Sequence, residues 1–273
     1  MDTIAVTGAE LSALVLGQDG APAVVMLHGL VSGNMASWYS SIASPLASTH
    51  RVLLYDQRGH GGSTVPAAGF DLDSQAQDLL VVLDHFGCAD EAVDLVGHSM
   101  GALIGLRFAL RHKQRVRRLV LVDAPMPACE FVAPSLRGVT SRAALAHYID
   151  HDLAAAAGLK GRRRERLQQR LAALFFESSL MQDVLAMGSE PDEALAALEL
   201  PVLLLYGRHS PCLAAGQHLQ QVLPQAELQL LEAGHYLPEE APDALCVHLQ
   251  RFLSDAPAGP GPAPAPAAAP PSP

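Results

Sequence analysis

Short apolar runs alternate with longer amphipathic segments along most of this chain. The runs cover residues 23–27, 52–55, 92–96, 119–122, 202–206 and 228–231. Runs of this length, separated by stretches long enough for helices, are typical of buried strands in a parallel sheet. Helix patterns lie at 37–46, 74–86, 102–112, 213–222 and 242–253, and Asp73 is placed to cap the second. The alternation predicts an α/β fold with a mostly parallel central sheet flanked by helices.

Two parts of the chain depart from this pattern. Residues 3–16 are typical of an antiparallel pair that leads into the sheet. From 125 to 198 helical patterns rich in alanine, leucine and arginine replace the strands. We therefore expect a core of residues 1–124 and 199–255 with a helical insertion at 125–198. Residues 256–273 are almost entirely alanine, proline and glycine, which supply no core, so we expect a disordered tail there.

Composition narrows the class of protein. The 273 residues fit one α/β domain with an insertion, and the net charge of −10 opposes binding to nucleic acid. No uncharged stretch is long enough to span a membrane, and the first residues lack a secretory signal pattern, so we expect a cytoplasmic protein. The 4 cysteines form no Cys-x-x-Cys pair, which favours free buried thiols over a metal or redox site.

A Gly-x-Ser-x-Gly sequence at 97–101 supplies a candidate nucleophile, Ser99. It lies between the apolar run ending at 96 and the helix pattern beginning at 102. A sharp strand-to-helix turn would hold Ser99 in a strained backbone conformation, and side chains larger than glycine at 97 and 101 would collide. By itself the pentapeptide is a weak signal, so its context must support it.

A serine nucleophile needs a base and a site for the developing negative charge. Among the 12 histidines, His235 follows the last apolar run directly, at the strand end where reacting groups gather in such sheets. The backbone amides of Met100 and Leu30 are the candidate oxyanion donors. His28, Gly29 and His98 are candidate substrate contacts, although His28 could equally be a structural histidine beside the turn.

Several motifs together resemble the α/β-hydrolase family over residues 3–253. They are His28-Gly29, the sequence Asp-Gln-Arg-Gly-His-Gly-Gly-Ser at 56–63, the pentapeptide at 97–101, and Gly234-His235 followed by Pro-Glu-Glu-Ala-Pro at 238–242. The resemblance implies a serine hydrolase whose insertion at 125–198 is a lid. The glycine-rich stretch at 59–62 lacks the Lys-Ser or Lys-Thr of a phosphate loop, which favours a structural turn.

The insertion allows two interpretations. Its apolar positions at helical spacing can form a small core of their own, or Phe175 and Phe176 can help line an acyl pocket. Its arginines at 162–164, 166 and 170 are either a solvated face or a docking site for an anionic carrier.

The sequence differs from the family pattern at the acid of the triad. In similar proteins the acid follows the strand matched here by 202–206, usually as Gly-x-x-Asp, but this chain has Ser210 there. Some members carry the acid one strand earlier, where this chain has Asp123. We expect Asp123 to be the relocated acid; the alternatives are that it only caps the entry to the insertion, or that Glu232 serves.

These observations predict a serine hydrolase that cleaves an ester or thioester through an acyl-enzyme on Ser99. We expect a small-molecule acyl substrate, free or bound to coenzyme A or a carrier, with no cofactor and no metal. His147 and His151 share a helical face, but the glutamate of a metalloprotease motif is missing. A carbon–carbon bond hydrolase, a lyase or cyclase, and a ligand-binding member with reduced activity remain alternatives.

Overall fold

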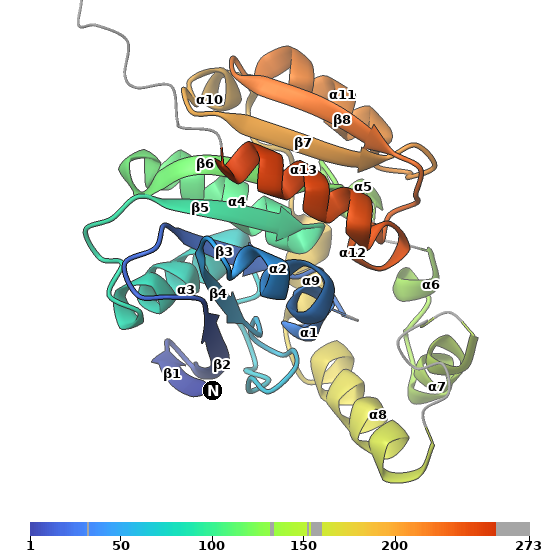
Figure 1. Ribbon diagram of the computed structural model, residues 1–273. Helices are drawn as coiled ribbons and strands as arrows, with labels where there is room; N and C mark the ends of the chain where they lie inside the picture. The colour runs from blue at the N-terminus through green and yellow to red at the C-terminus, as the bar shows by residue number, and fades with distance from the viewer. Residues whose placement is uncertain (32, 132–133, 152, 154–159, 255–273) are drawn as a thin grey trace, which may run out of the picture.

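The computed structural model describes residues 1–31, 33–131, 134–151, 153 and 160–254. Its centre is an eight-stranded sheet in the order β1-β2-β4-β3-β5-β6-β7-β8 (Figure 1). The strands are β1 (Asp2–Val6), β2 (Ala9–Leu16), β3 (Ala23–Leu27), β4 (Arg51–Tyr55), β5 (Val93–His98), β6 (Val116–Val122), β7 (Val202–Gly207) and β8 (Ala226–Leu231). The pairs β1–β2 and β2–β4 are antiparallel and the others parallel, which confirms the predicted fold class.

Helices connect the strands. They are α1 (Ala36–Trp38), η1 (Tyr39–Ala43), α2 (Ser44–Leu46), α3 (Leu72–His85), α4 (Met100–Arg111), η2 (Lys113–Arg115), α5 (Ala128–Phe131), α6 (Pro134–Arg137), α7 (Arg142–His151), α8 (Gly161–Phe176), α9 (Leu180–Ala186), α10 (Asp192–Ala196), α11 (Leu213–Val222), α12 (Leu237–Glu240) and α13 (Pro242–Ser254). Between β6 and β7 the described residues form helices α5 to α10 and no strand. The expected tail at 256–273 and the side chain of Cys129 lie outside the described part.

Side-chain alternation along the strands builds two cores. Val25 and Leu27 of β3 belong to the core that includes buried residues of α3, α4 and α11. Their neighbours Val24 and Met26 point the opposite way and pack with Trp38 and residues of α13. The period of two along a strand explains this separation. Both β3 and β5 are fully buried; the sequence of β3 is uninterruptedly apolar, whereas β5 also buries Asp94 and His98.

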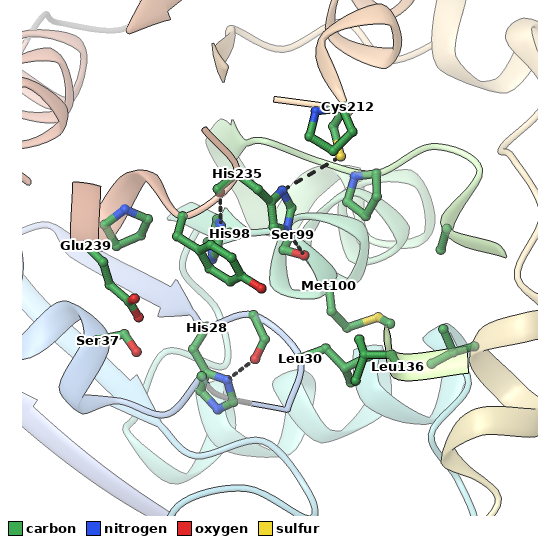
Figure 2. A pocket seen from close by; sticks show the side chains of 18 of the residues that line it. His28, Leu30, Ser37, His98, Ser99, Met100, Leu136, Cys212, His235 and Glu239 are labelled. Carbon is green, nitrogen blue, oxygen red and sulfur yellow. Dashed lines mark hydrogen bonds between the residues drawn. The ribbon is translucent and has the colours of Figure 1, made fainter. Parts of the chain in front are cut away.

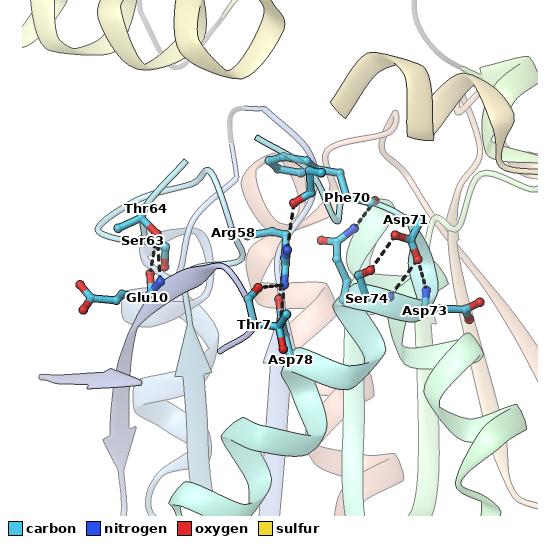
Figure 3. Close-up of polar contacts among 12 residues, drawn as sticks. Thr7, Glu10, Arg58, Ser63, Thr64, Phe70, Asp71, Asp73, Ser74 and Asp78 are labelled. Atoms are coloured by element: carbon cyan, nitrogen blue, oxygen red, sulfur yellow. Dashed lines mark hydrogen bonds and ion pairs between the residues drawn. The ribbon is translucent and has the colours of Figure 1, made fainter. Parts of the chain in front are cut away.

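Some element boundaries differ from the prediction. β6 begins at Val116, earlier than its apolar run, because Arg117 and Arg118 contribute to the strand while pairing with the fully buried carboxylate of Asp94 at 2.6 and 2.9 Å. α3 is capped by Asp71, whose carboxylate accepts hydrogen bonds from the backbone of Asp73 and Ser74, so the prediction of Asp73 as the cap is wrong (Figure 3).

The glycine-rich turn after β4 is structural, as its sequence favours. The Arg58 guanidinium forms a buried two-bond pair with Asp78 of α3, at 2.7 and 2.6 Å (Figure 3). The Asp56 carboxylate accepts hydrogen bonds from the backbone amides of Met35 and Gly62. The Arg58–Asp78 pair ties the turn to α3, and the Asp56–Met35 bond ties it to the segment that follows β3, which borders the cavity described below.

The composition led to two further expectations, one about the cysteines and one about membrane-spanning segments. Cys88, Cys212 and Cys246 are free and buried, as predicted for those three. Within the part of the chain that the structure covers, every helix is too short or too polar to cross a membrane.

Candidate active site

Ser99 stands at the turn between β5 and α4 with φ 53° and ψ −118°. This positive φ is costly for a residue with a side chain, and such strain is typical of functional positions. The flanking glycines make the turn possible: a Cβ on Gly97 would overlap the carbonyl of Gly101, and one on Gly101 would overlap the carbonyls of Leu27 and His28. The Ser99 amide donates to the Val122 carbonyl at 2.9 Å, which ties the turn to the end of β6.

His235 lies directly beside Ser99. Its Nε2 is 3.0 Å from the Ser99 Oγ, within hydrogen-bond reach, and its backbone carbonyl accepts a 2.8 Å bond from the His98 ring. Glu240 holds the turn around His235, because its carboxylate accepts from the amides of Gly234 and Tyr236. The sequence motif contained Glu240, but its anchoring role follows only from the fold.

Asp123 completes a continuous hydrogen-bonded chain. Its Oδ2 is 2.7 Å from the His235 Nδ1, and its side chain is fully buried. Like Ser99 it has a positive φ, 49°. Its Oδ1 accepts the Gly207 amide at 2.9 Å, and its Oδ2 also accepts the hydroxyl of Ser210. The structure thus brings Asp123, the expected relocated acid, into contact with His235.

Ser210, where the family pattern has an acid, is a partner of Asp123. Its hydroxyl donates to the carboxylate and accepts the Cys212 amide at 3.0 Å. β6 and β7 are parallel neighbours, paired up to Val122 and Leu205, so their following residues meet. The fallback acid Glu232 is exposed and pairs with His209 and Arg208.

The candidate oxyanion donors lie in the right segments. Leu30 and Met100 both border the same cavity as Ser99, and neither backbone amide makes a hydrogen bond with another described residue.

The loop that carries Leu30 is held by two buried histidines. His28 accepts the Gln57 amide at 2.9 Å, and His60 accepts the Val31 amide at 2.9 Å. The His28 ring is thus engaged in structure as well as bordering the cavity.

A cavity of about 410 Å³ opens over these groups (Figure 2). His28, Gly29 and His98 line it, as expected for substrate contacts. Phe175 and Phe176 are not among its described lining residues, so that expectation is not met. Phe175 packs against Tyr148 at a ring distance of 6.5 Å, and Phe176 lies beside the Arg142 guanidinium.

Other residues form the walls instead. The insertion contributes Leu136 and Val184, and the core contributes Trp38, Cys212 and Tyr236. Sequence reasoning missed all five, because Leu136 and Val184 depend on how the insertion helices pack and the three core residues carry no local signal of facing the cavity. Figure 2 places Leu30, Met100 and Leu136 on one side of Ser99 and Ser37 and Glu239 on the other.

One group of atoms could hold a metal ion. The Asp123 carboxylate, the Cys212 thiol and the His235 ring have ligand atoms within 4.8 Å of one another. A metal there would have to displace the Asp123–His235 hydrogen bond. It would also have to ionise a thiol whose pKa burial, aided by the Asp123 charge, raises to about 12.

The sequence of the chain is similar to those of known proteins. A family model described as alpha/beta hydrolase fold matches residues 22–152. The chain is 26% identical over 269 residues to 3-oxoadipate enol-lactonase 2 of Acinetobacter baylyi, covering 89% of the chain and 92% of the relative. It is 40% identical over 111 residues to a protein named as a carbamate hydrolase of Variovorax paradoxus, a match that spans only 41% of that relative.

Solved structures share the fold. The enol-lactonase from Burkholderia xenovorans superimposes with a TM-score of 0.74 at 23% identity, over 93% of this chain and 100% of that one. A carboxylesterase from Bacillus subtilis gives a TM-score of 0.72, also at 23% identity, over 93% of this chain and 90% of that one. Sheet order, the strained serine turn and these matches agree: the chain has the α/β-hydrolase fold, and the family model of that description covers its residues 22–152.

Proposed function

We propose that this protein is a serine hydrolase that cleaves a carboxylic ester or thioester through an acyl-enzyme on Ser99. The observation that carries the proposal is the unbroken chain from the Ser99 hydroxyl through His235 to the buried carboxylate of Asp123, at 3.0 and 2.7 Å. Ser99 and His235 border a cavity large enough for a small-molecule substrate.

Each residue has a defined part in the reaction. His235 Nε2 accepts the Ser99 proton as the serine oxygen attacks the carbonyl carbon, and later gives that proton to the leaving alcohol or thiol. Asp123 accepts a hydrogen bond from the Nδ1–H of His235, which selects the ring tautomer that leaves Nε2 free and stabilises the imidazolium. The amides of Leu30 and Met100 receive the developing oxyanion. Water activated by His235 then releases the acyl group.

The helical insertion at 125–198 acts as the lid in this proposal. Leu136 of α6 and Val184 of α9 line the cavity that Ser99 faces, so the packing of these helices sets its shape. Substrate preference should therefore respond to changes on the insertion without loss of the chemistry. A Val184→Ala variant should extend the range of acyl chains accepted while the smallest ester is cleaved as before.

A thioester carried by coenzyme A is the second form of substrate. Arg162, Arg163 and Arg166 of α8 are exposed, and none forms an ion pair among the described residues, so they can meet phosphate groups outside the cavity. Reversing Arg163 and Arg166 to glutamate should weaken acyl-coenzyme A turnover and leave simple esters unaffected. Equal turnover of acyl-coenzyme A would exclude this docking face.

The deciding experiment combines labelling with turnover. Wild type should hydrolyse short p-nitrophenyl esters and form a covalent adduct with a fluorophosphonate, detected by intact mass, and Ser99→Ala should do neither. Ligand binding without turnover or adduct would point to the binding-protein alternative. A product mass that lacks the added water would point to a lyase or cyclase.

A further inference from the structure

Two glutamate carboxylates add negative charge to the wall of the cavity. Glu130 of α5 and Glu239 of α12 both line it, and no lysine or arginine is among the described lining residues. Neither carboxylate forms a hydrogen bond or an ion pair with any other described residue. Partial burial of Glu239, together with the nearby charge of Glu240, raises the pKa of its carboxyl group.

The histidines of the cavity do not offset this charge. Burial lowers the pKa of both His28 and His98 to about 4, so both rings are neutral near pH 7. The His28 ring accepts the Gln57 amide, which requires a neutral ring, whereas the bond that the His98 ring donates to the His235 carbonyl favours the charged form and is outweighed by burial. His235 must itself be neutral to accept the serine proton.

We propose that this cavity selects ester or thioester substrates whose acyl and leaving groups carry no carboxylate, and favours those with a neutral or cationic amine-bearing group. The inference rests on the proposed function, since it concerns the substrate of that same site. A free carboxylate entering the cavity would lose water and meet two like charges without a cationic partner. An ammonium would meet Glu239, which lies with Ser37 on the side of Ser99 opposite Leu30 and Leu136 (Figure 2).

Three p-nitrophenyl esters of matched length test the proposal: the hexanoate, the 6-aminohexanoate and the adipate monoester. They share a leaving group, and each rate is divided by the rate of hydroxide hydrolysis of the same ester. Both carboxylates are exposed, and replacing a cation by an anion about 8 Å from a carboxylate in water changes the rate by roughly fivefold per carboxylate. We therefore expect kcat/KM for the cationic ester to exceed that for the anionic ester by roughly twentyfold, with the neutral ester between them.

Variants then locate the effect. Glu239→Gln and Glu130→Gln should each reduce the cation-to-anion ratio about fivefold, and the double variant should bring it near one. Glu193→Gln on α10, an exposed glutamate outside the cavity, should leave the ratio unchanged. High salt should reduce the ratio in wild type and leave it unaltered in the double variant.

Binding separates this inference from the proposed function. Hexanamide, 6-aminohexanamide and adipic acid monoamide cannot report turnover, but their affinities for Ser99→Ala can be measured by calorimetry. The same order of affinity supports the inference even if no ester is hydrolysed, an outcome that would overturn the hydrolase proposal alone. If the anionic ester or amide performs as well as its cationic counterpart, the inference is wrong while hydrolysis stands.

Discussion

The acid of the proposed triad gives the sharpest test, through Asp123→Asn. This change keeps the shape of the side chain and removes its charge. The asparagine oxygen must still accept the Gly207 amide, which Asp123 Oδ1 accepts at 2.9 Å, so its amino group turns toward His235 and Ser210. That group donates to His235 Nδ1 and forces the proton onto Nε2. His235 can then no longer accept the serine proton.

The expected fall in kcat follows from the contact between Asp123 and His235. An imidazolium and a carboxylate about 4 Å apart at an effective dielectric constant of 20 attract by about 4 kcal/mol, which corresponds to roughly a thousandfold in rate. The wrong tautomer adds a further penalty, so kcat should fall about 10³- to 10⁴-fold with KM little changed. The assay is p-nitrophenyl ester hydrolysis, with thermal unfolding as the check on folding. A fall of less than tenfold in a folded variant would refute the role of Asp123.

Ser210 provides the matched controls. Ser210→Ala removes one hydrogen bond to the carboxylate and should lower kcat only several-fold, with a stability loss of about 1 kcal/mol. Moving the acid with Asp123→Ser and Ser210→Asp together returns it to the position usual in similar proteins. Because the Ser210 hydroxyl touches the same Oδ2 that contacts His235, the double variant should recover part of the activity that Asp123→Ser alone loses. No recovery would mean that residue 210 cannot reach His235.

Three further changes test the framework around the site. Gly101→Ala places a Cβ against the Leu27 carbonyl and should lower both melting temperature and esterase activity, whereas Gly188→Ala, which meets nothing within 4 Å, should do neither. The pKa of His28 and of His98 is lowered to about 4 in the folded chain, so the unfolded chain binds more protons below about pH 6.5. The free energy of unfolding, measured with urea, should therefore fall by about 2 kcal/mol per histidine from pH 7 to pH 5. An unchanged urea midpoint would contradict this. Arg58→Met leaves a buried carboxylate on α3 without its partner and should cost about 3–5 kcal/mol in chemical denaturation, while a loss below about 1 kcal/mol would show that the pair is not needed.

The strands were predictable because burial on both faces leaves a plain signal. Residues 23–27 coincide with β3, and the other runs fall within their strands or one residue beyond. The early start of β6 was missed because its polar residues have a partner far away in the sequence. Arg117 and Arg118 extend β6 because Asp94 neutralises them, and no local pattern announces that pairing.

The cavity was less predictable than the reacting groups. Helical spacing indicates that Phe175 lies on an apolar face, but it does not say whether that face packs against Tyr148 or against a substrate. Leu136 and Val184 reach the cavity only through the arrangement of α6 and α9. The charge of its wall likewise depends on which glutamates the fold places beside the cavity, so no local pattern marks Glu130 or Glu239 as lining residues.

In the proposed triad the acid follows β6, one strand away from the position usual in similar proteins, and the geometry of the site explains how it still faces His235. The residues after β6 and β7 meet at the same sheet edge, because the two strands are parallel neighbours in register up to Val122 and Leu205. Asp123 and Ser210 therefore contact one another although 87 positions separate them in sequence. In the proposed triad His235 requires a carboxylate at one point in space, and Asp123 at the end of β6 supplies it. The hydroxyl of Ser210 is then not a vestige of a lost acid, because it donates to the carboxylate that the neighbouring strand provides. A serine at the usual acid position signals loss of activity only where the end of the preceding strand carries no acid either.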